Sequence, residues 1–262
     1  MGHNWLMLRF FKNWHRKRTL RRSTLDPALW QRVTGALPFL QRLRPEEWQR
    51  LQDCAVLFLA EKEMHGARGF VLTDAVRVSI AVQACLPILN LGLDAYQGWV
   101  GIVVYPGEFK VRREETDENG VVHEYDDELS GEAWPGGPVI LSWEDIKLGE
   151  AGYNVVIHEF AHKLHMVGGD MDDFPQPHAD MAREPWFEAW DVSYAGFCNQ
   201  VDRGKHTLID PYASEHPAEF FAVLSEAFFT LPVEVRSAYP ELYRQLALFY
   251  RQDPAERLLA SA

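Results

Sequence analysis

The chain has 262 residues, of which 47% are hydrophobic and 13% aromatic, which is enough apolar material for a substantial buried core. Its formal net charge of −12 argues against general nucleic-acid binding through the body of the protein. Three widely spaced cysteines, Cys54, Cys85 and Cys198, give no disulfide framework and favour a reducing, cytoplasmic compartment. Polar groups interrupt every apolar stretch, so no transmembrane segment is predicted.

The first 22 residues differ from the rest of the chain because they contain many Lys and Arg residues but no Asp or Glu. These charges break the apolar run that a signal peptide would need. A basic, aromatic helix could make peripheral contact with an anionic membrane or bind an acidic partner. We expect instead that residues 1–22 fold back on the acidic body or stay disordered. Residues 1–25 are therefore assigned as an extension and residues 26–262 as a single domain.

The patterns that follow predict a mainly helical α+β fold. Helices are expected at 27–33, 37–43, 45–63, 73–89, 155–164, 185–207, 217–229 and in segments of 233–259. Strands are expected at 100–105 and 138–143. The charged segment 108–137 is expected to form a hairpin or a mobile loop, and 168–175 an acidic loop.

The segment 155–164 contains an H-E-x-x-H motif, with His158, Glu159 and His162 at its fixed positions. On an α-helix the two histidines lie one turn apart on the same face, which suits binding of one tetrahedral Zn²⁺. Glu159 would lie beside the metal, where it could accept a proton from a water and pass it to a leaving amine. The apolar neighbours predict a buried helix, in which these polar groups need a metal or other partners.

A zinc hydrolase site of this kind needs a third protein ligand. The metzincin extension of the motif fails, because His165 and Gly168 stand where that pattern requires Gly and His. His165 remains a ligand candidate, although a polar residue at the end of the helix is the simpler interpretation. The common alternative is a glutamate from a later helix, which gives a site with two histidines and one glutamate.

The segment 210–229 supplies that glutamate. Ser214 is expected to cap a strongly apolar helix that has Pro217 in its first turn. Glu219 and Glu226 are seven residues apart and therefore share one face of this helix. We assign Glu219 as the third metal ligand, because a carboxylate in so apolar a helix needs a metal or a hydrogen-bonded partner. Glu226 either orients a metal-bound imidazole or is a surface carboxylate.

Several stretches together resemble the Mlc titration factor A family of bacterial zinc peptidases. The matching stretches are 86–93, 137–143, 154–164, 210–213 and 217–226. The resemblance implies a gluzincin-type, zincin-like core similar to that of anthrax lethal factor, with a small β-sheet beside the motif helix. We expect a helical and β part at 26–145 and a zinc-binding helical part at 146–262.

Carried over by position, His158, His162 and Glu219 match the zinc ligands of that family, and Glu159 matches its general base. Tyr212 matches a tyrosine placed seven residues before the ligand glutamate. The hydroxyl of that tyrosine can stabilise the developing oxyanion, because a donor aimed at new negative charge contributes most in a water-poor site.

A strand beside the cleft of such peptidases pairs with extended substrate through backbone hydrogen bonds. Residues 139–143 are either that strand or an ordinary core strand.

The resemblance implies aminopeptidase activity on short peptides or aminoacyl substrates. It also implies a regulatory partner, the glucose-system transcription repressor Mlc, whose binding would stimulate the peptidase and remove the repressor from its operator, so that sugar uptake is regulated. The alternative is a protein that mainly sequesters the repressor and has weak or partner-activated peptidase activity. The intact Glu159 favours an enzyme, because a purely structural zinc site needs no general base.

Overall fold

The computed structural model describes residues 2–23, 25–41, 43–116, 122–148, 152–168 and 174–259. The predicted mainly helical α+β fold is confirmed, with one small sheet in a largely helical molecule. Its helices are α1 (Gly2–Arg22), α2 (Pro27–Gly35), α3 (Pro45–Glu61), α4 (Asp74–Cys85), α5 (Trp143–Leu148), α6 (Val155–His165), α7 (Arg183–Asp202), α8 (Pro217–Thr230), α9 (Pro232–Ala238), α10 (Pro240–Tyr250) and α11 (Pro254–Leu259).

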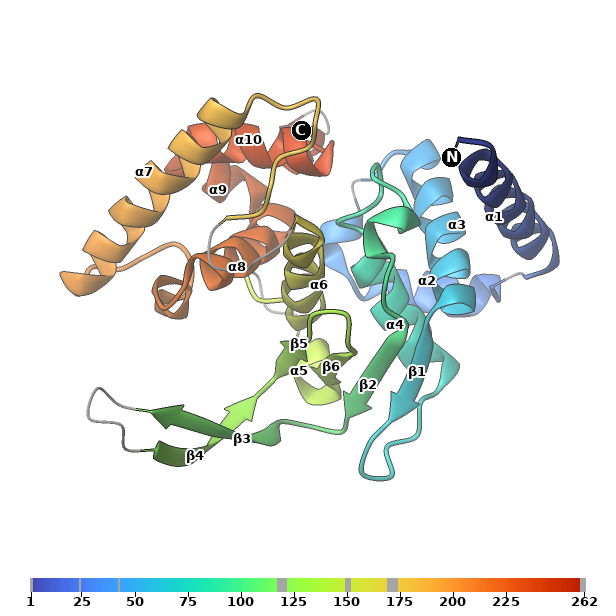
Figure 1. Cartoon of the computed structure of the whole chain (residues 1–262), viewed down its shortest axis with the longest axis horizontal. Helices are drawn as coiled ribbons and strands as arrows, with labels where there is room; N and C mark the ends of the chain where they lie inside the picture. Colours follow the sequence, from blue (N-terminus) through green and yellow to red (C-terminus); the bar gives the residue numbers. More distant parts are fainter. Residues whose placement is uncertain are drawn as a thin grey trace.

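The strands are β1 (Glu63–Gly66), β2 (Gly101–Tyr105), β3 (Phe109–Thr116), β4 (Val122–Leu129), β5 (Gly131–Ala133) and β6 (Val139–Ser142). Four of them form one sheet in the order β1-β2-β6-β5, in which β5 runs antiparallel to β6 and the other pairs are parallel. Strands β3 and β4 form a separate antiparallel hairpin that projects from the body in Figure 1. The hairpin predicted within 108–137 is therefore confirmed for its described residues.

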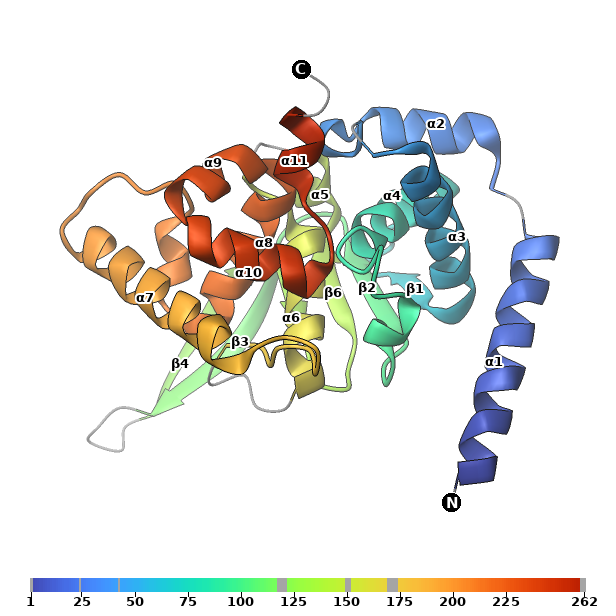
Figure 2. The same ribbon diagram turned by 90° about the horizontal axis from the view of Figure 1, so that it is seen from above.

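Helix α6 lies at the centre of the molecule, between α2–α4 on one side and α7–α10 on the other (Figures 1 and 2). It packs directly against α4, α8 and the strands β5 and β6. This central position explains why apolar residues surround the helix on nearly all sides, since a helix without a solvent face buries its whole circumference.

Phe160 anchors α6 in an aromatic cluster on the side of α3 and the sheet. Its ring centroid lies 5.1 Å from that of Tyr96 and 5.6 Å from those of Trp99 and Phe58. Aromatic pairs at such distances add to the stabilisation that their buried area gives. The cluster therefore fixes the position and rotation of the helix that carries the H-E-x-x-H motif.

The N-terminal helix α1 packs along α3 at the edge of the molecule (Figure 2). Lys12 forms an ion pair with Asp94 at 2.6 Å, and Arg16 pairs with Glu61 at 2.8 Å and with Asp94 at 2.9 Å. The expected folding back on acidic residues is thus what the described side chains show. None of the helices in the described part of the chain combines the length and apolar character that crossing a bilayer requires.

Several elements differ from the sequence prediction. The helix expected over 37–43 is only a 3₁₀ turn, Pro38–Leu40, and the helix expected over 73–89 ends at Cys85. The helix expected over 45–63 ends at Glu61, because the next residues form β1 and pair with β2. The short strand β5 and the helix α5 were not predicted. The acidic loop expected at 168–175 lies mostly outside the described residues.

Candidate metal centre

The motif helix α6 begins at Val155, and the side chain of the preceding residue, Asn154, caps it. The Asn154 Oδ1 accepts a hydrogen bond from the Ile157 N–H at 2.9 Å, which satisfies one of the free donors at the start of the helix. The Asn154 amide also donates to Gln83 Oε1 of α4 at 2.7 Å. An Asn directly before an apolar helical run is a capping signal, and sequence reasoning overlooked it here.

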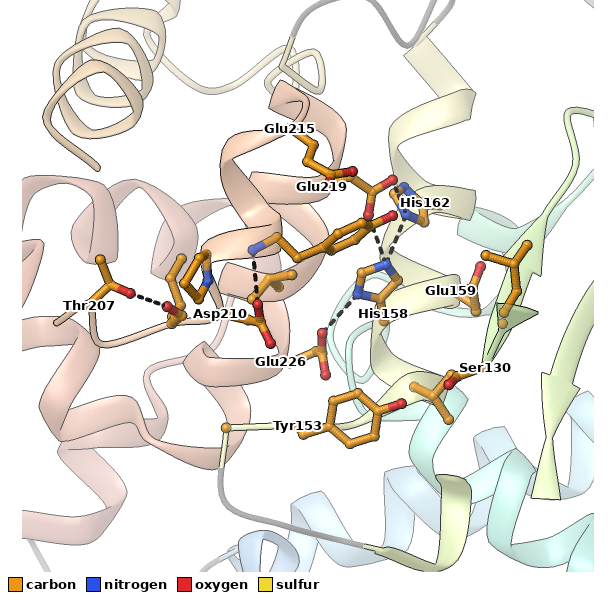
Figure 3. A pocket seen from close by; sticks show the side chains of 18 of the residues that line it. Ser130, Tyr153, His158, Glu159, His162, Thr207, Asp210, Glu215, Glu219 and Glu226 are labelled. Carbon is orange, nitrogen blue, oxygen red and sulfur yellow. Dashed lines mark hydrogen bonds and ion pairs between the residues drawn. The ribbon is translucent and has the colours of Figure 1, made fainter. Parts of the chain in front are cut away.

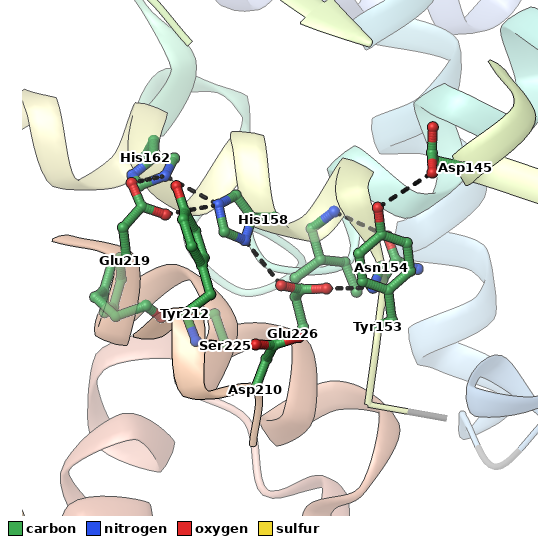
Figure 4. Close-up of polar contacts among 12 residues, drawn as sticks. Asp145, Tyr153, Asn154, His158, His162, Asp210, Tyr212, Glu219, Ser225 and Glu226 are labelled. Carbon is green, nitrogen blue, oxygen red and sulfur yellow. Dashed lines mark hydrogen bonds and ion pairs between the residues drawn. The ribbon is translucent and has the colours of Figure 1, made fainter. Parts of the chain in front are cut away.

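The structure brings His158, His162 and Glu219 together. Their candidate ligand atoms all lie within 4.8 Å of one another. Within the described part of the chain, these three residues form a group that could hold a metal ion. The His158 Nε2 lies 3.1 Å from Glu219 Oε2 and 3.2 Å from His162 Nε2, while His162 Nε2 lies 3.5 Å from Glu219 Oε1. Figure 4 shows the three side chains converging from α6 and α8.

These separations fit a tetrahedral metal ion. Bonds of about 2.0–2.1 Å at tetrahedral angles place neighbouring ligand atoms about 3.3–3.4 Å apart. The observed separations of 3.1, 3.2 and 3.5 Å lie close to that value, with His158 nearest to Oε2 of Glu219 and His162 nearest to its Oε1. Two imidazole nitrogens and a carboxylate oxygen also form a donor set that zinc commonly accepts.

Glu226 is not a surface carboxylate but a buried residue that contacts His158. Its side chain is only 2% exposed, and its Oε1 accepts from His158 Nδ1 at 2.8 Å. Its other oxygen accepts a short hydrogen bond from the backbone N–H of Asn154. Glu226 therefore fixes the orientation of the His158 ring so that Nε2 faces Glu219, a contact typical of metal-binding histidines.

Helix α8 places Glu219 and Glu226 on the face that meets α6, as their spacing predicts. The expected cap was wrong, however, because His216 caps the helix: its Nδ1 accepts from the Ala218 N–H at 3.1 Å. Pro217 occupies the first helical position, where its fixed φ suits the start of a helix. Ser214 instead ends a separate 3₁₀ turn, η4 (Pro211–Ser214).

Tyr212 belongs to that 3₁₀ turn and lies at the mouth of the site. Asp210 caps the turn by accepting from the Tyr212 N–H at 2.9 Å. Figure 4 shows the Tyr212 side chain pointing toward His158 and Glu219, and the residue is 45% exposed. A bound molecule could therefore reach its hydroxyl without displacing the core.

His165 does not join the metal group in the described structure. It is buried at the end of α6, and its ring meets that of Phe221 at a centroid distance of 5.7 Å. The simpler interpretation of His165, a polar residue at the end of the helix, agrees with its place outside the group, and the structure adds that the ring is buried against Phe221.

Burial and the neighbouring ionisable side chains together shift the pKa values of His158, His162 and Glu219. Burial alone would lower the pKa of His158, but hydrogen bonds with Glu219 and Glu226 raise it well above its usual value. Burial lowers the pKa of His162. Burial opposes ionisation of Glu219, yet the hydrogen bonds from the two histidines outweigh it and hold its pKa far below normal.

Glu159 lies beside this group without belonging to it. The residue is 4% exposed, and among the described residues no hydrogen-bond partner reaches its Oε2. Burial raises the pKa of Glu159 to about 8. In Figure 3 its side chain extends from α6 on the side of the neighbouring strands, while the histidines face α8.

A cavity of about 1090 Å³ opens in front of these side chains. It is bordered by β5, by the start of α6, by the segment 205–212 and by α8. Strand β6 is bonded to β2 on one side and to β5 on the other, so the core-strand interpretation of 139–143 holds. Strand β5 is the terminal strand of the sheet on the cavity side and, within the described residues, pairs only with β6.

A largely enclosed group of two histidines and one glutamate, with the carboxylate of Glu159 beside it, is typical of metal-dependent hydrolases. The comparisons with known proteins agree: the model of the glucose-regulated metallo-peptidase M90 family matches residues 11–251. The chain is 38% identical to Mlc titration factor A of Salmonella paratyphi B, over 87% of each chain. It is 37% identical to Mlc titration factor A of Pectobacterium atrosepticum, over 87% of this chain and 88% of that one.

It is also 36% identical to an uncharacterized protein of Synechocystis sp., over 92% of this chain and 90% of the relative. The chain belongs to the M90 metallopeptidase family, and the resemblance to Mlc titration factor A is confirmed.

Proposed function

We propose that this protein is a zinc-dependent aminopeptidase. The observation that carries the proposal is the convergence of the His158, His162 and Glu219 ligand atoms beside the buried Glu159 carboxylate. Zinc held by these three side chains would act as a Lewis acid that polarises a scissile carbonyl and acidifies a water. A site that only stabilised the fold would need no carboxylate next to its ligands.

The residues around the metal ligands would carry out the proton transfers. Glu159 would take a proton from the attacking water and deliver it to the leaving amine. The Tyr212 hydroxyl would donate a hydrogen bond to the carbonyl oxygen of the scissile bond as that oxygen becomes an oxyanion. Glu226 would keep His158 in the tautomer whose Nε2 is free to bind the metal.

The cavity suits a peptide with a free N-terminus. Its lining includes Glu132, Glu159 and Glu215 but, among the described residues, Lys205 is its lone Lys or Arg. This acidic surplus favours binding of an ammonium group. The terminal strand β5 could pair with the peptide backbone.

The decisive experiment compares zinc-loaded wild type with Glu159→Gln on a panel of aminoacyl chromogenic substrates and their N-acetylated forms. We expect hydrolysis of the free-amine substrates by the wild type, loss of that activity in the variant, and equal zinc content in both. Preferential hydrolysis of the acetylated forms would contradict an aminopeptidase. Hydrolysis that survives in Glu159→Gln would contradict the role of Glu159.

We propose repressor binding as a second function, supported by the name that two relatives carry, Mlc titration factor A. In this proposal the protein binds the repressor Mlc or an equivalent and thereby regulates sugar uptake. Glu159→Gln should still release the purified repressor from a labelled operator fragment. Failure of both wild type and variant to do so would contradict this function and leave the peptidase proposal standing.

Two further proposals concern organisation. Residues 26–262 would act as one domain, a view supported by a single cluster of buried hydrophobic side chains that extends from Val33 to Ala255. A cytoplasmic location is supported by the cysteines Cys54, Cys85 and Cys198, which are all free thiols.

A further inference from the structure

Gly131, the first residue of β5, lies against the side chain of Glu159. A Cβ atom added at Gly131 would overlap Oε1 of Glu159 and lie 2.7 Å from both its Cδ and its Cγ. Ordinary contacts between carbon atoms are about 3.5–4.0 Å. The missing side chain at residue 131 is therefore what leaves room for the Glu159 carboxylate.

The backbone of Gly131 does not itself demand glycine. Its φ is not among the positive values found at other glycines of the described chain. An alanine could therefore adopt the same backbone conformation, and the conflict would arise from the methyl group alone.

Lys163 prevents β5 from moving away from such a methyl group. It lies one turn after Glu159 on α6, is 2% exposed, and donates to the Trp134 carbonyl at 2.6 Å and the Gly137 carbonyl at 2.8 Å. These carbonyls belong to the turn that joins β5 to β6. Two charge-assisted hydrogen bonds thus fasten the hairpin to the helix that carries Glu159.

The rest of the strand is held as well. Residues 131–133 pair with 139–141 of β6, and β6 in turn is bonded to β2 in the middle of the sheet. A methyl group at residue 131 would therefore displace the Glu159 carboxylate rather than the strand. Since Glu159 is enclosed, its carboxylate would leave the place that it holds beside His158 and His162.

We propose that Gly131 is a positioning residue for Glu159: because it has no side chain, it determines where the carboxylate lies next to the metal ligands. This inference rests on the proposed function, in which Glu159 is the general base. Gly131 also lines the cavity, so the double variants with Glu159→Ala separate its effect on Glu159 from any effect on substrate binding.

The kinetic test uses zinc-loaded Gly131→Ala. We expect kcat to fall by roughly 10²-fold with zinc content unchanged, because a displacement of about 1 Å at a reacting group has a cost of that order. In the Glu159→Ala background, Gly131→Ala should not lower the residual rate further. Wild-type kcat in Gly131→Ala would overturn the inference.

The matched control is Gly101→Ala in the neighbouring strand β2. A Cβ there would meet Pro138 Cβ at an ordinary 3.5 Å. Its kcat should equal that of the wild type, and its thermal stability should stay the same or rise slightly, because alanine restricts the unfolded chain more than glycine.

A thermal double-mutant cycle tests the geometry without any activity. Gly131→Ala should lower Tm by roughly 2–6 °C in the wild type, as overpacking of a buried contact does, and far less in Glu159→Ala. If Gly131→Ala lowered Tm by the same amount in the wild type and in Glu159→Ala, the inference would be overturned. An inactive wild type with a clear coupling in this cycle would instead refute the peptidase proposal and leave the positioning of Glu159 by Gly131 intact.

Discussion

Replacing Glu226 by Gln removes one acceptor at the point where α6 and α8 meet. The carboxylate accepts hydrogen bonds from two donors at once, the His158 Nδ1–H and the Asn154 backbone N–H. Glutamine has one oxygen and one NH₂ group, so it can accept from one of these donors but must present its own donor to the other. Either the His158 ring or the start of α6 then loses its partner inside the protein.

The expected magnitude follows from these two contacts. Loss of the partner that orients a metal-bound histidine typically lowers metal affinity by about 10–100-fold, which corresponds to about 1.4–2.7 kcal/mol. A buried donor left unpaired costs a further ~1–3 kcal/mol of folding stability. For a chain of this size that stability loss lowers Tm by roughly 2–10 °C.

The assay measures zinc affinity by competition with a chromophoric chelator, and Tm with zinc and with EDTA. Glu234→Gln on α9 is the matched control, because Glu234 is an exposed glutamate. We expect this variant to keep the zinc affinity and the Tm of the wild type. Glu226→Gln should lose affinity and show a smaller Tm rise on zinc addition than the wild type. Zinc affinity within twofold of the wild type would refute the role of Glu226 as the residue that orients His158.

Three other substitutions test separate parts of the structure. Tyr212→Phe should lower kcat by about 10²-fold at unchanged zinc content, because it removes only a donor to the oxyanion, and an unchanged kcat would exclude that role. Burial alone would raise the pKa of Glu47, but hydrogen bonds from Arg44 and Arg257 outweigh it and lower that pKa. The ionised form of Glu47 therefore stabilises the fold above its usual pKa of 4.5, and this contribution is lost as the pH falls through the folded-state value. Glu47→Gln should lower Tm at pH 7, with a difference from wild type that shrinks toward pH 3; a constant difference would contradict this linkage. Lys163→Met should speed hydrogen exchange across 131–137 more than elsewhere, because it frees the hairpin from α6, and uniform exchange would contradict such an anchor.

The sequence predicts most of the metal centre because its spacings are short-range. His158 and His162 are one helical turn apart, and Glu219 and Glu226 two turns apart, so each pair shares a face whatever the tertiary structure. Apolar patterns likewise predict α6 and α8, with boundaries close to those observed. These patterns do not predict which faces of the helices pack against each other. Only the contact of α8 with α6 decides that Glu226 accepts from His158 instead of facing solvent.

The two strands that the sequence analysis missed, β1 and β5, depend on long-range pairing. Strand β5 has only three residues, Gly131–Ala133, too few to show an alternating pattern, and it exists because β6 lies beside it. Strand β1 continues directly from a helix and is defined by its pairing with β2. The prediction placed the cap of α8 at Ser214 because serine is a strongly preferred capping residue. Histidine is not among the common capping residues, so His216 was overlooked.

The packing of α6 explains how so short a segment can hold several groups in one arrangement. Its His158 and His162 face α8, while Glu159 and Lys163 face the β5–β6 hairpin and Phe160 enters the aromatic cluster. Successive residues are about 100° apart around a helix, so these sets occupy neighbouring sides of the same two turns. A rotation of the helix would therefore move the proposed metal ligands and the Glu159 carboxylate together and break the contacts on every side. The relative placement of the proposed metal ligands and of the Glu159 carboxylate is thus a property of the buried core, whereas Tyr212 lies on the exposed turn η4 outside α6.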